Sequence, residues 1–157
     1  MRYNAAWTSF LPPTSRHDEC GIQLVQGSDD SRPTLLLADD DPIVRSAFSS
    51  QLGGDFNVIA AAHDAVQAIE LAAEHQPDAA LVDVEMPNGG ARAAVPAIAT
   101  RSPDTCIVIL SGDESSQMVI ELLEAGAIAY VRKGVSGAQI ATTLADALRV
   151  KAGGSRP

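Results

Sequence analysis

The sequence predicts an α/β fold in which a five-stranded parallel sheet carries helices on both faces. Three observations favour this class. Five short apolar runs alternate in strict order with segments of helical periodicity, as expected for a parallel sheet with right-handed crossovers. Turn-forming residues separate these segments. The run Ala79 to Asp83 ends in one carboxylate before a turn sequence, which places Asp83 where open parallel sheets bind their ligands.

The apolar runs give the expected positions of the strands. Apart from the run that ends at Asp83, the strands are expected at residues 34–38, 56–61, 107–110 and 127–132. The segment from Ala91 to Thr100 has helical propensity but contains Pro96, which removes a backbone donor, so we expect a short or kinked helix there.

Capping signals and apolar spacing give the other helices. Asp41 is expected as the N-cap of the first, with Pro42 as its first residue, and Asp64 caps the second. Ser136 and Gln139 have the spacing of a capping box for the last helix. The residues expected to face the core recur at helical spacing: Val44, Phe48 and Leu52; Val66, Ile69 and Ala73; Met118, Val119, Leu122 and Leu123; Ile140, Leu144 and Leu148.

The chain of 157 residues has the length of one domain. Residues 1–33 lack a sustained apolar period and are expected to form a mobile extension, residues 34–150 the domain, and residues 151–157 a frayed tail. The extension contains three aromatic residues, which either pack loosely on the domain, the interpretation we favour, or form a short docking motif for a partner: Tyr3, Trp7 and Phe10.

Composition narrows the class of function. The net charge of −9 would repel phosphate backbones and anionic lipids, so we expect no direct binding to nucleic acid and none to membranes. No stretch approaches the roughly 20 apolar residues of a membrane helix, and we expect a cytoplasmic protein. Cys20 and Cys106 are far apart and have no metal-ligand spacing, so neither a zinc site nor a disulfide is expected.

Acidic residues end two of the expected strands. If the strands ending before Asp39 and at Asp83 are parallel neighbours, three or four carboxylates converge at one edge of the sheet, where they repel each other unless a cation neutralises them. Mg²⁺ suits such a site, because it takes one or two carboxylates together with water and phosphate oxygens. Ser111 and Lys133 also lie at strand ends. A carboxylate nucleophile, a divalent ion, a fixed cation and a hydroxyl are the parts that phosphoryl uptake requires.

Four motifs, LLLADDDP, ALVDVEMP, VILSG and AYVRKG, follow one another in the order found in response-regulator receiver domains, and the chain resembles this family over residues 34 to 150. The resemblance implies a flavodoxin-like doubly wound sheet with strand order 2-1-3-4-5 and five helices. It also implies a module of a two-component phosphorelay that is phosphorylated by a partner histidine kinase or phosphotransfer protein. Such a module switches a protein-interaction surface toward a downstream output protein or domain, and a homodimer that depends on phosphorylation is compatible with it.

The same resemblance assigns roles to residues that match the motifs. Asp83 is implied as the phosphoacceptor. The residues implied to hold Mg²⁺ are Asp39, Asp40, Asp83 and Glu85, the last through its backbone carbonyl; those implied to contact the phosphoryl group or report its presence are Ser111, Lys133 and Tyr130. The family's lysine is commonly followed by proline, often with a cis bond, whereas Gly134 follows Lys133 here. Since a cis bond before a residue other than proline costs about 2.5 to 4 kcal/mol, we expect a trans bond.

Alternatives remain at this point. Singly, Asp39 could be a helix cap, Ser111 a turn residue, Tyr130 ordinary strand packing and Lys133 a solvated charge. A magnesium-dependent phosphohydrolase could use Asp83 as its nucleophile and Glu85 as a general acid, but such enzymes carry this pair on the first strand and have a cap insertion. A degenerate receiver would serve only as an interaction surface. We favour a receiver that accepts a phosphoryl group, can lose it by autodephosphorylation, and turns over no external substrate.

Overall fold

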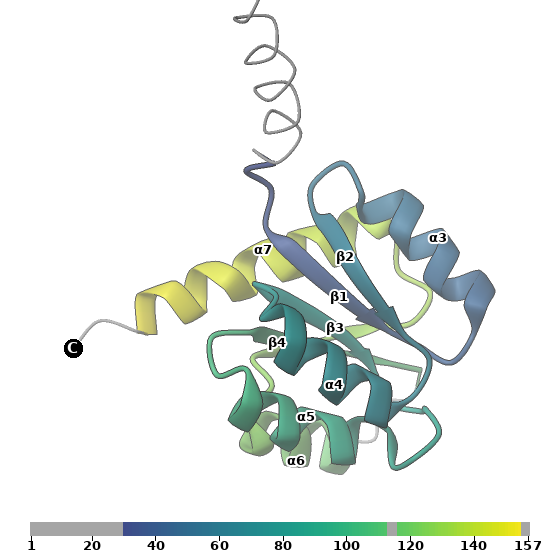
Figure 1. Cartoon of the computed structure of the whole chain (residues 1–157), viewed down its shortest axis with the longest axis vertical. Coiled ribbons are helices and arrows are strands. Elements are labelled where there is room, and N and C mark those ends of the chain that lie inside the picture. The colour runs from purple at the N-terminus through teal and green to yellow at the C-terminus, as the bar shows by residue number, and fades with distance from the viewer. Residues whose placement is uncertain (1–29, 113–115, 155–157) are drawn as a thin grey trace, which may run out of the picture. The chain divides into compact units, whose positions relative to one another are not determined.

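The computed structural model describes residues 30–112 and 116–154, and Figure 1 shows their arrangement. By internal contacts the chain divides into two units, Met1–Ser31 and Arg32–Pro157, and the fold described below belongs to the second. The predicted extension over residues 1–33 and the docking motif considered within it therefore lie almost wholly outside the described residues, as does Cys20.

Strands and helices alternate throughout the second unit. The strands are β1 (Thr34–Ala38), β2 (Asn57–Ala62), β3 (Ala79–Asp83), β4 (Cys106–Ser111) and β5 (Ala129–Arg132). The helices are α3 (Pro42–Leu52), α4 (Ala65–His75), α5 (Gly90–Arg101), α6 (Ser116–Ala125) and α7 (Gly137–Gly154). All strand pairs are parallel, and the order β2-β1-β3-β4-β5 with five described helices confirms the predicted flavodoxin-like topology.

Two apolar layers form the core, one on each face of the sheet. Alternate residues of the central strands point to opposite faces, as the two-residue period of a strand requires. Leu36 and Val82 pack with residues of α4, α5 and α6, whereas Leu37 and Leu81 pack with residues of α3 and α7. Figure 1 shows α4 to α6 together on one side of the sheet and α3 and α7 on the other. The sheet is therefore covered on both faces, which explains the nearly continuous apolar character of its central strands.

The predicted helix caps are present. Asp41 accepts a hydrogen bond from the backbone N–H of Ile43 at 2.8 Å, and Asp64 accepts one from Gln67 N at 2.7 Å. At the start of α7, the Ser136 N–H donates to Gln139 Oε1 at 3.1 Å and the Gln139 N–H donates to Ser136 Oγ at 3.2 Å. This is the reciprocal pair of the predicted capping box.

Four predictions about the helices were wrong in part. On α6, Leu123 was expected to face the core but is 38% exposed. On α4 the buried stripe is Ala65, Ala68 and Ala72, and Val66 is 49% exposed, because the small side chains face the sheet. Helix α5 has 12 residues despite Pro96, so it is not short. Helix α7 continues to Gly154, beyond the predicted start of a frayed tail at Lys151. The Lys151 ammonium donates to the carbonyl oxygens of Pro103 at 2.7 Å and Thr105 at 3.0 Å, which ties this last turn to the domain.

Candidate functional site

The carboxylate cluster lies where β1 and β3 end side by side. Ala38 pairs with Val82, so Asp39 and Asp83 are the next residues at the same level of the sheet. Carboxylate oxygens of Asp39, Asp40 and Asp83 all lie within 4.8 Å of one another. Asp39 and Asp83 are buried and Asp40 is exposed. The fold thus brings together the acidic residues that the sequence predicted would converge.

Lys133 joins this cluster from β5. Its ammonium nitrogen Nζ lies 2.8 Å from Asp83 Oδ2; the side chain of Asp83 is 1% exposed and that of Lys133 is 39% exposed. The backbone N–H of Lys133 donates to the carbonyl of Ser111 at 2.8 Å, which fixes the start of the loop after β5. The Lys133–Gly134 bond is trans, as predicted, and Gly134 has a φ of +94° that favours glycine. The chain therefore turns at Gly134 while the lysine side chain reaches the acidic cluster.

Burial and charge act in opposite directions on this pair. Burial raises the pKa of Asp83, with help from the charge of Asp39, and outweighs the lowering effects of Lys133 and of the Glu85 N–H. Burial alone would lower the pKa of Lys133, but the hydrogen bond to Asp83 and the charges of the three aspartates raise it overall. Burial therefore opposes ionisation of Asp83, whereas the three aspartates favour the protonated, charged form of Lys133.

The remaining predicted residues lie on the loop after β3, on β4 and on β5, and they differ in burial. The Glu85 N–H donates to Asp83 Oδ1 at 3.2 Å, so the backbone of Glu85 lies beside the carboxylate while its side chain is exposed. Ser111 ends β4, next to β3, and is buried. Tyr130 lies on the edge strand β5 and is 46% exposed. The roles of Glu85, Ser111 and Tyr130 remain predictions.

Asp39 provides the test of whether the cluster fits a cation. Its Oδ1 accepts a hydrogen bond from the Asp41 N–H at 2.9 Å. Its Oδ2 is buried and has no hydrogen-bond partner within the described part of the chain. A buried carboxylate oxygen without a partner is costly, and a cation bound by oxygen ligands would remove that cost. The donor set, three carboxylates with one of them open to solvent, therefore fits a hard divalent ion.

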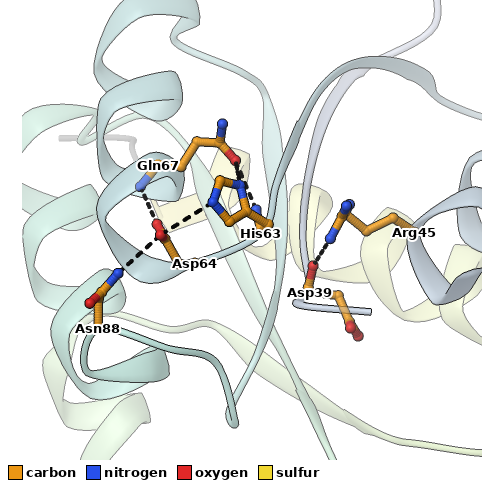
Figure 2. A network of polar contacts seen from close by, with 6 residues as sticks. All are labelled: Asp39, Arg45, His63, Asp64, Gln67 and Asn88. Carbon is orange, nitrogen blue, oxygen red and sulfur yellow. Dashed lines mark hydrogen bonds and ion pairs between the residues drawn. The ribbon is translucent and has the colours of Figure 1, made fainter. Parts of the chain in front are cut away.

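Sequence reasoning missed one residue at this edge. Arg45, on the first turns of α3, donates from Nη1 to the backbone carbonyl of Asp39 at 2.5 Å, as Figure 2 shows. The bond joins α3 to the residue that follows β1, within the acidic cluster. A basic residue one turn after the acidic motif, on a helix that starts beside the site, is the signal that could have identified it.

Comparison with known proteins decides the family. The sequence model of the family described as the response regulator receiver domain matches residues 35–145, more than half of the chain. The chain belongs to the response-regulator receiver domain family. With this family shown, neither a phosphohydrolase nor a degenerate receiver is favoured, and the receiver domain is one of two-component signal transduction.

Individual relatives agree with this assignment. The receiver is 36% identical to the transcriptional regulatory protein YxjL of Bacillus subtilis over 122 residues, 76% of this chain and 54% of YxjL. It is 34% identical to the oxygen regulatory protein NreC of Staphylococcus epidermidis over 109 residues, 68% of this chain and 50% of NreC. Among solved structures, the signal receiver domain of the response regulator NarL from Mycobacterium tuberculosis has a TM-score of 0.72 at 26% identity, covering 75% of this chain and 97% of that domain. The chain spans about half the length of the curated relatives.

The expectation of no direct nucleic-acid binding was wrong. YxjL is named a transcriptional regulatory protein, and a DNA-binding response regulator of Staphylococcus aureus has the same fold, with a TM-score of 0.68 at 22% identity over 74% of this chain and 98% of that one. The expectation used the net charge of −9 alone. Net charge averages over the whole chain and says nothing of a separate basic surface in a longer regulator, so it cannot exclude nucleic acid for proteins of this kind.

Two further findings bear on function. Relatives of the receiver are named regulators rather than conventional enzymes. In residues 30–112 and 116–154, the helices are all too short or too polar to cross a membrane.

Proposed function

We propose that Asp83 accepts a phosphoryl group from a histidine kinase or a phosphotransfer protein. The observation that supports this most strongly is the position of Asp83: a buried carboxylate paired with Lys133 at 2.8 Å, beside two further aspartates at the carboxyl edge of the sheet. A structural role alone does not explain this arrangement, since burying a charge and placing like charges next to it both cost stability.

The chemistry follows from the residues present. A carboxylate oxygen of Asp83 forms a bond to phosphorus as the bond from phosphorus to the imidazole nitrogen of the donor histidine breaks. The electron pair of the broken bond stays on that nitrogen, which is then free to take up a proton. Lys133 is held in place by its bond to Asp83 and supplies positive charge where the oxygens of the transferring group become negative.

Asp39, Asp40 and Asp83, with the backbone carbonyl of Glu85, would hold Mg²⁺. The buried, unpartnered oxygen of Asp39 and the exposed carboxylate of Asp40 support this assignment, because Mg²⁺ combines few protein ligands with water. When bound, the ion would neutralise charge on the phosphoryl oxygens.

The consequence of phosphorylation is proposed to be a switch rather than turnover of an external substrate. Ser111, buried at the end of the strand next to β3, is proposed to contact the phosphoryl oxygens, and Tyr130, half exposed on the edge strand, to change its environment in response. We place this reaction in the cytoplasm, where a kinase would have ATP.

Phosphorylation of the intact chain tests the proposal directly. Incubation with acetyl phosphate and Mg²⁺ should add one phosphoryl group, measured by intact mass, and Asp83→Asn should abolish it. Asp104→Asn is the matched control, because Asp104 is an exposed aspartate at the other edge of the sheet. Persistence of the added mass in Asp83→Asn would refute the assignment, and sustained release of phosphate from a monoester would favour the phosphohydrolase.

We also propose that this receiver controls nucleic-acid binding in the protein that carries it. The support is the name of YxjL, of which the chain covers 54% at 36% identity. Capture of genomic DNA fragments by the full natural protein, with and without phosphorylation, tests this. Equal capture in both states would contradict control by the receiver.

A further inference from the structure

The loop from β3 to α5 carries Glu85 past the phosphorylation site and is attached to the start of α4. Figure 2 shows the side chain of Asn88 directed at Asp64, the residue that caps α4. Asn88 Nδ2 donates to Asp64 Oδ2 at 3.0 Å, and the N–H of Ala65 donates to the carbonyl of Pro87 at 3.2 Å. Two bonds therefore hold the tip of the loop on the first turn of a helix that is distant in sequence.

Asp64 caps α4 and also binds the loop. One carboxylate oxygen, Oδ1, caps the helix by accepting from Gln67 N at 2.7 Å, and the other accepts from Asn88. His63 lies on the same carboxylate, with Nε2 3.5 Å from Oδ2, and contacts Gln67 through Nδ1 at 2.5 Å. The Gln67 N–H, followed by the Asn88 amide and the charge of His63, holds the pKa of Asp64 below its usual value despite some desolvation. The bond to Asn88 is thus charge-assisted at neutral pH.

The backbone of the loop is tightly constrained near its tip. Asn88 has a φ of +64°, Gly89 +102° and Gly90 +57°. A Cβ at Gly90 would lie 2.4 Å from the carbonyl oxygen of Val84, so the chain doubles back on the start of the loop. There the Val84 N–H donates to Leu110 of β4 at 2.9 Å. The loop is therefore fixed by β4 at one end and by α4 at the other, and Glu85 lies between these two points.

We propose that the hydrogen bond between Asp64 and Asn88 is a positioning contact for the phosphorylation site. It holds the β3–α5 loop so that the backbone of Glu85 stays beside Asp83, where the Glu85 N–H lies 3.2 Å from Oδ1. This inference rests on the proposed function, because the position of Glu85 matters for chemistry only if Asp83 accepts the phosphoryl group with Mg²⁺. Asp64 and Asn88 touch none of the reacting atoms and act through the loop.

Three variants test the hydrogen bond between Asp64 and Asn88 separately from the backbone conformation of the loop and the cap of α4. Asn88→Gly keeps the left-handed backbone conformation and removes the amide. Asp64→Ser keeps an N-cap side chain but is too short to reach Asn88. Gln76→Ala is the matched control, since it removes hydrogen bonds from the opposite end of the same helix, to Arg101 O at 3.1 Å among others.

The experiment measures phosphorylation of the full chain by acetyl phosphate as a function of Mg²⁺ concentration. Loss of a residue that orients metal ligands typically weakens metal affinity at least tenfold, so Asn88→Gly and Asp64→Ser should each raise the half-saturating Mg²⁺ concentration about tenfold. The double variant should be no worse than either single one, because both remove the same bond. Gln76→Ala should leave the value unchanged. An unchanged half-saturating Mg²⁺ concentration in both Asn88→Gly and Asp64→Ser would overturn the proposal.

The rate of hydrogen exchange at the Glu85 amide tests the positioning contact without requiring that Asp83 be phosphorylated. In Asn88→Gly that amide should exchange about tenfold faster than in the wild type, because the loop that carries it opens more often. If the wild type accepts no phosphoryl group at Asp83, the proposed function fails, and the exchange rate still decides the positioning contact. An exchange rate equal to that of the wild type would then overturn it.

Discussion

Lys133 and Asp83 form an ion pair at the carboxyl edge of the sheet, with 2.8 Å between Nζ and Oδ2, and this pair only partly offsets the cost of burying the aspartate. Burial leaves the pKa of Asp83 raised even with the lysine present. The ionised carboxylate therefore makes the folded state less stable at neutral pH. Removal of the Asp83 charge, or a cation bound near it, should therefore stabilise the folded state.

Asp83→Asn should raise the free energy of unfolding of the unphosphorylated protein at pH 7. The amide has the same shape and no charge to desolvate. The gain should be absent below pH 3.8, the ordinary pKa of aspartate, because the carboxyl group is then protonated in both the folded and unfolded states. It should grow as the pH rises above 3.8, where the unfolded state loses its proton first, and stay constant once the pH exceeds the raised folded pKa. Urea unfolding between pH 3.5 and 8, with Asp104→Asn as control, measures this, and a gain independent of pH would contradict it.

Lys133→Met should have the opposite effect at neutral pH. It leaves the charge of Asp83 without its partner. We expect a loss of about 1 kcal/mol, below the roughly 1.5 to 3 kcal/mol of a bond to a charged group, because the ammonium is partly exposed. The loss should be smaller in the Asp83→Asn background. A double-mutant cycle by urea unfolding checks this; equal losses in the two backgrounds would show that the pair does not interact.

Mg²⁺ should stabilise the unphosphorylated protein. A ligand that binds only the folded state at 100 times its Kd stabilises it by about 2.7 kcal/mol, and here it also relieves repulsion among three aspartates. Asp40→Ala should remove most of the rise in Tm. Asp41→Ser is the matched control, since it removes a neighbouring charge and retains a cap for the Ile43 N–H. An undiminished rise in Asp40→Ala would place the ion elsewhere.

The sequence predicted the topology and the convergence of the site because both follow from local signals. Apolar runs gave the strands, and once β1 and β3 are neighbours their carboxyl ends must meet. The face of α4 could not be predicted in the same way. Val66 is more apolar than Ala65 by any scale, but the tight space beneath the helix selects small side chains, and that space is a property of the assembled sheet.

Contacts between segments that are distant in the sequence could not be predicted either. The bond from Asn88 to Asp64 joins residues 24 positions apart, and each residue has a sufficient local explanation, a left-handed turn for one and a helix cap for the other. The extension of α7 past Lys151 depends likewise on carbonyl groups that come from another part of the chain. A local pattern reports what a residue can do alone, and these roles exist only in the folded protein.

Deletion of residues 1–29 should leave phosphorylation by acetyl phosphate unchanged. All residues proposed for the site lie between Asp39 and Lys133, within the unit Arg32–Pro157, and the contacts that join Asp39, Asp40, Asp83 and Lys133 lie within that unit. Intact mass after a timed reaction, compared with the full chain, measures this. A truncated protein that is folded by circular dichroism but accepts no phosphoryl group would make the deleted segment part of the site.

Gly134→Ala should destabilise the protein through the backbone alone. Gly134 has a φ of +94°, which a residue with a Cβ rarely adopts, yet a Cβ there would meet no atom within 4 Å. We expect a loss of about 1 to 2 kcal/mol, the cost of a left-handed conformation for an L-residue. Gly54→Ala is the matched control: its Cβ also meets nothing within 4 Å and its φ lies outside the left-handed region, so it should be neutral or stabilise by about 0.4 to 1 kcal/mol.

The same substitution should slow phosphorylation, because Gly134 lets the chain turn directly after Lys133 and so places the ammonium on Asp83. Relaxing the strain at residue 134 would rotate the preceding peptide and move that side chain. The free energy of unfolding in urea and the initial rate of phosphorylation by acetyl phosphate should therefore both fall in Gly134→Ala. Neither should fall in Gly54→Ala. Equal stabilities for the two variants would show that the loop after β5 tolerates a second conformation, and that the position of Lys133 does not depend on the glycine.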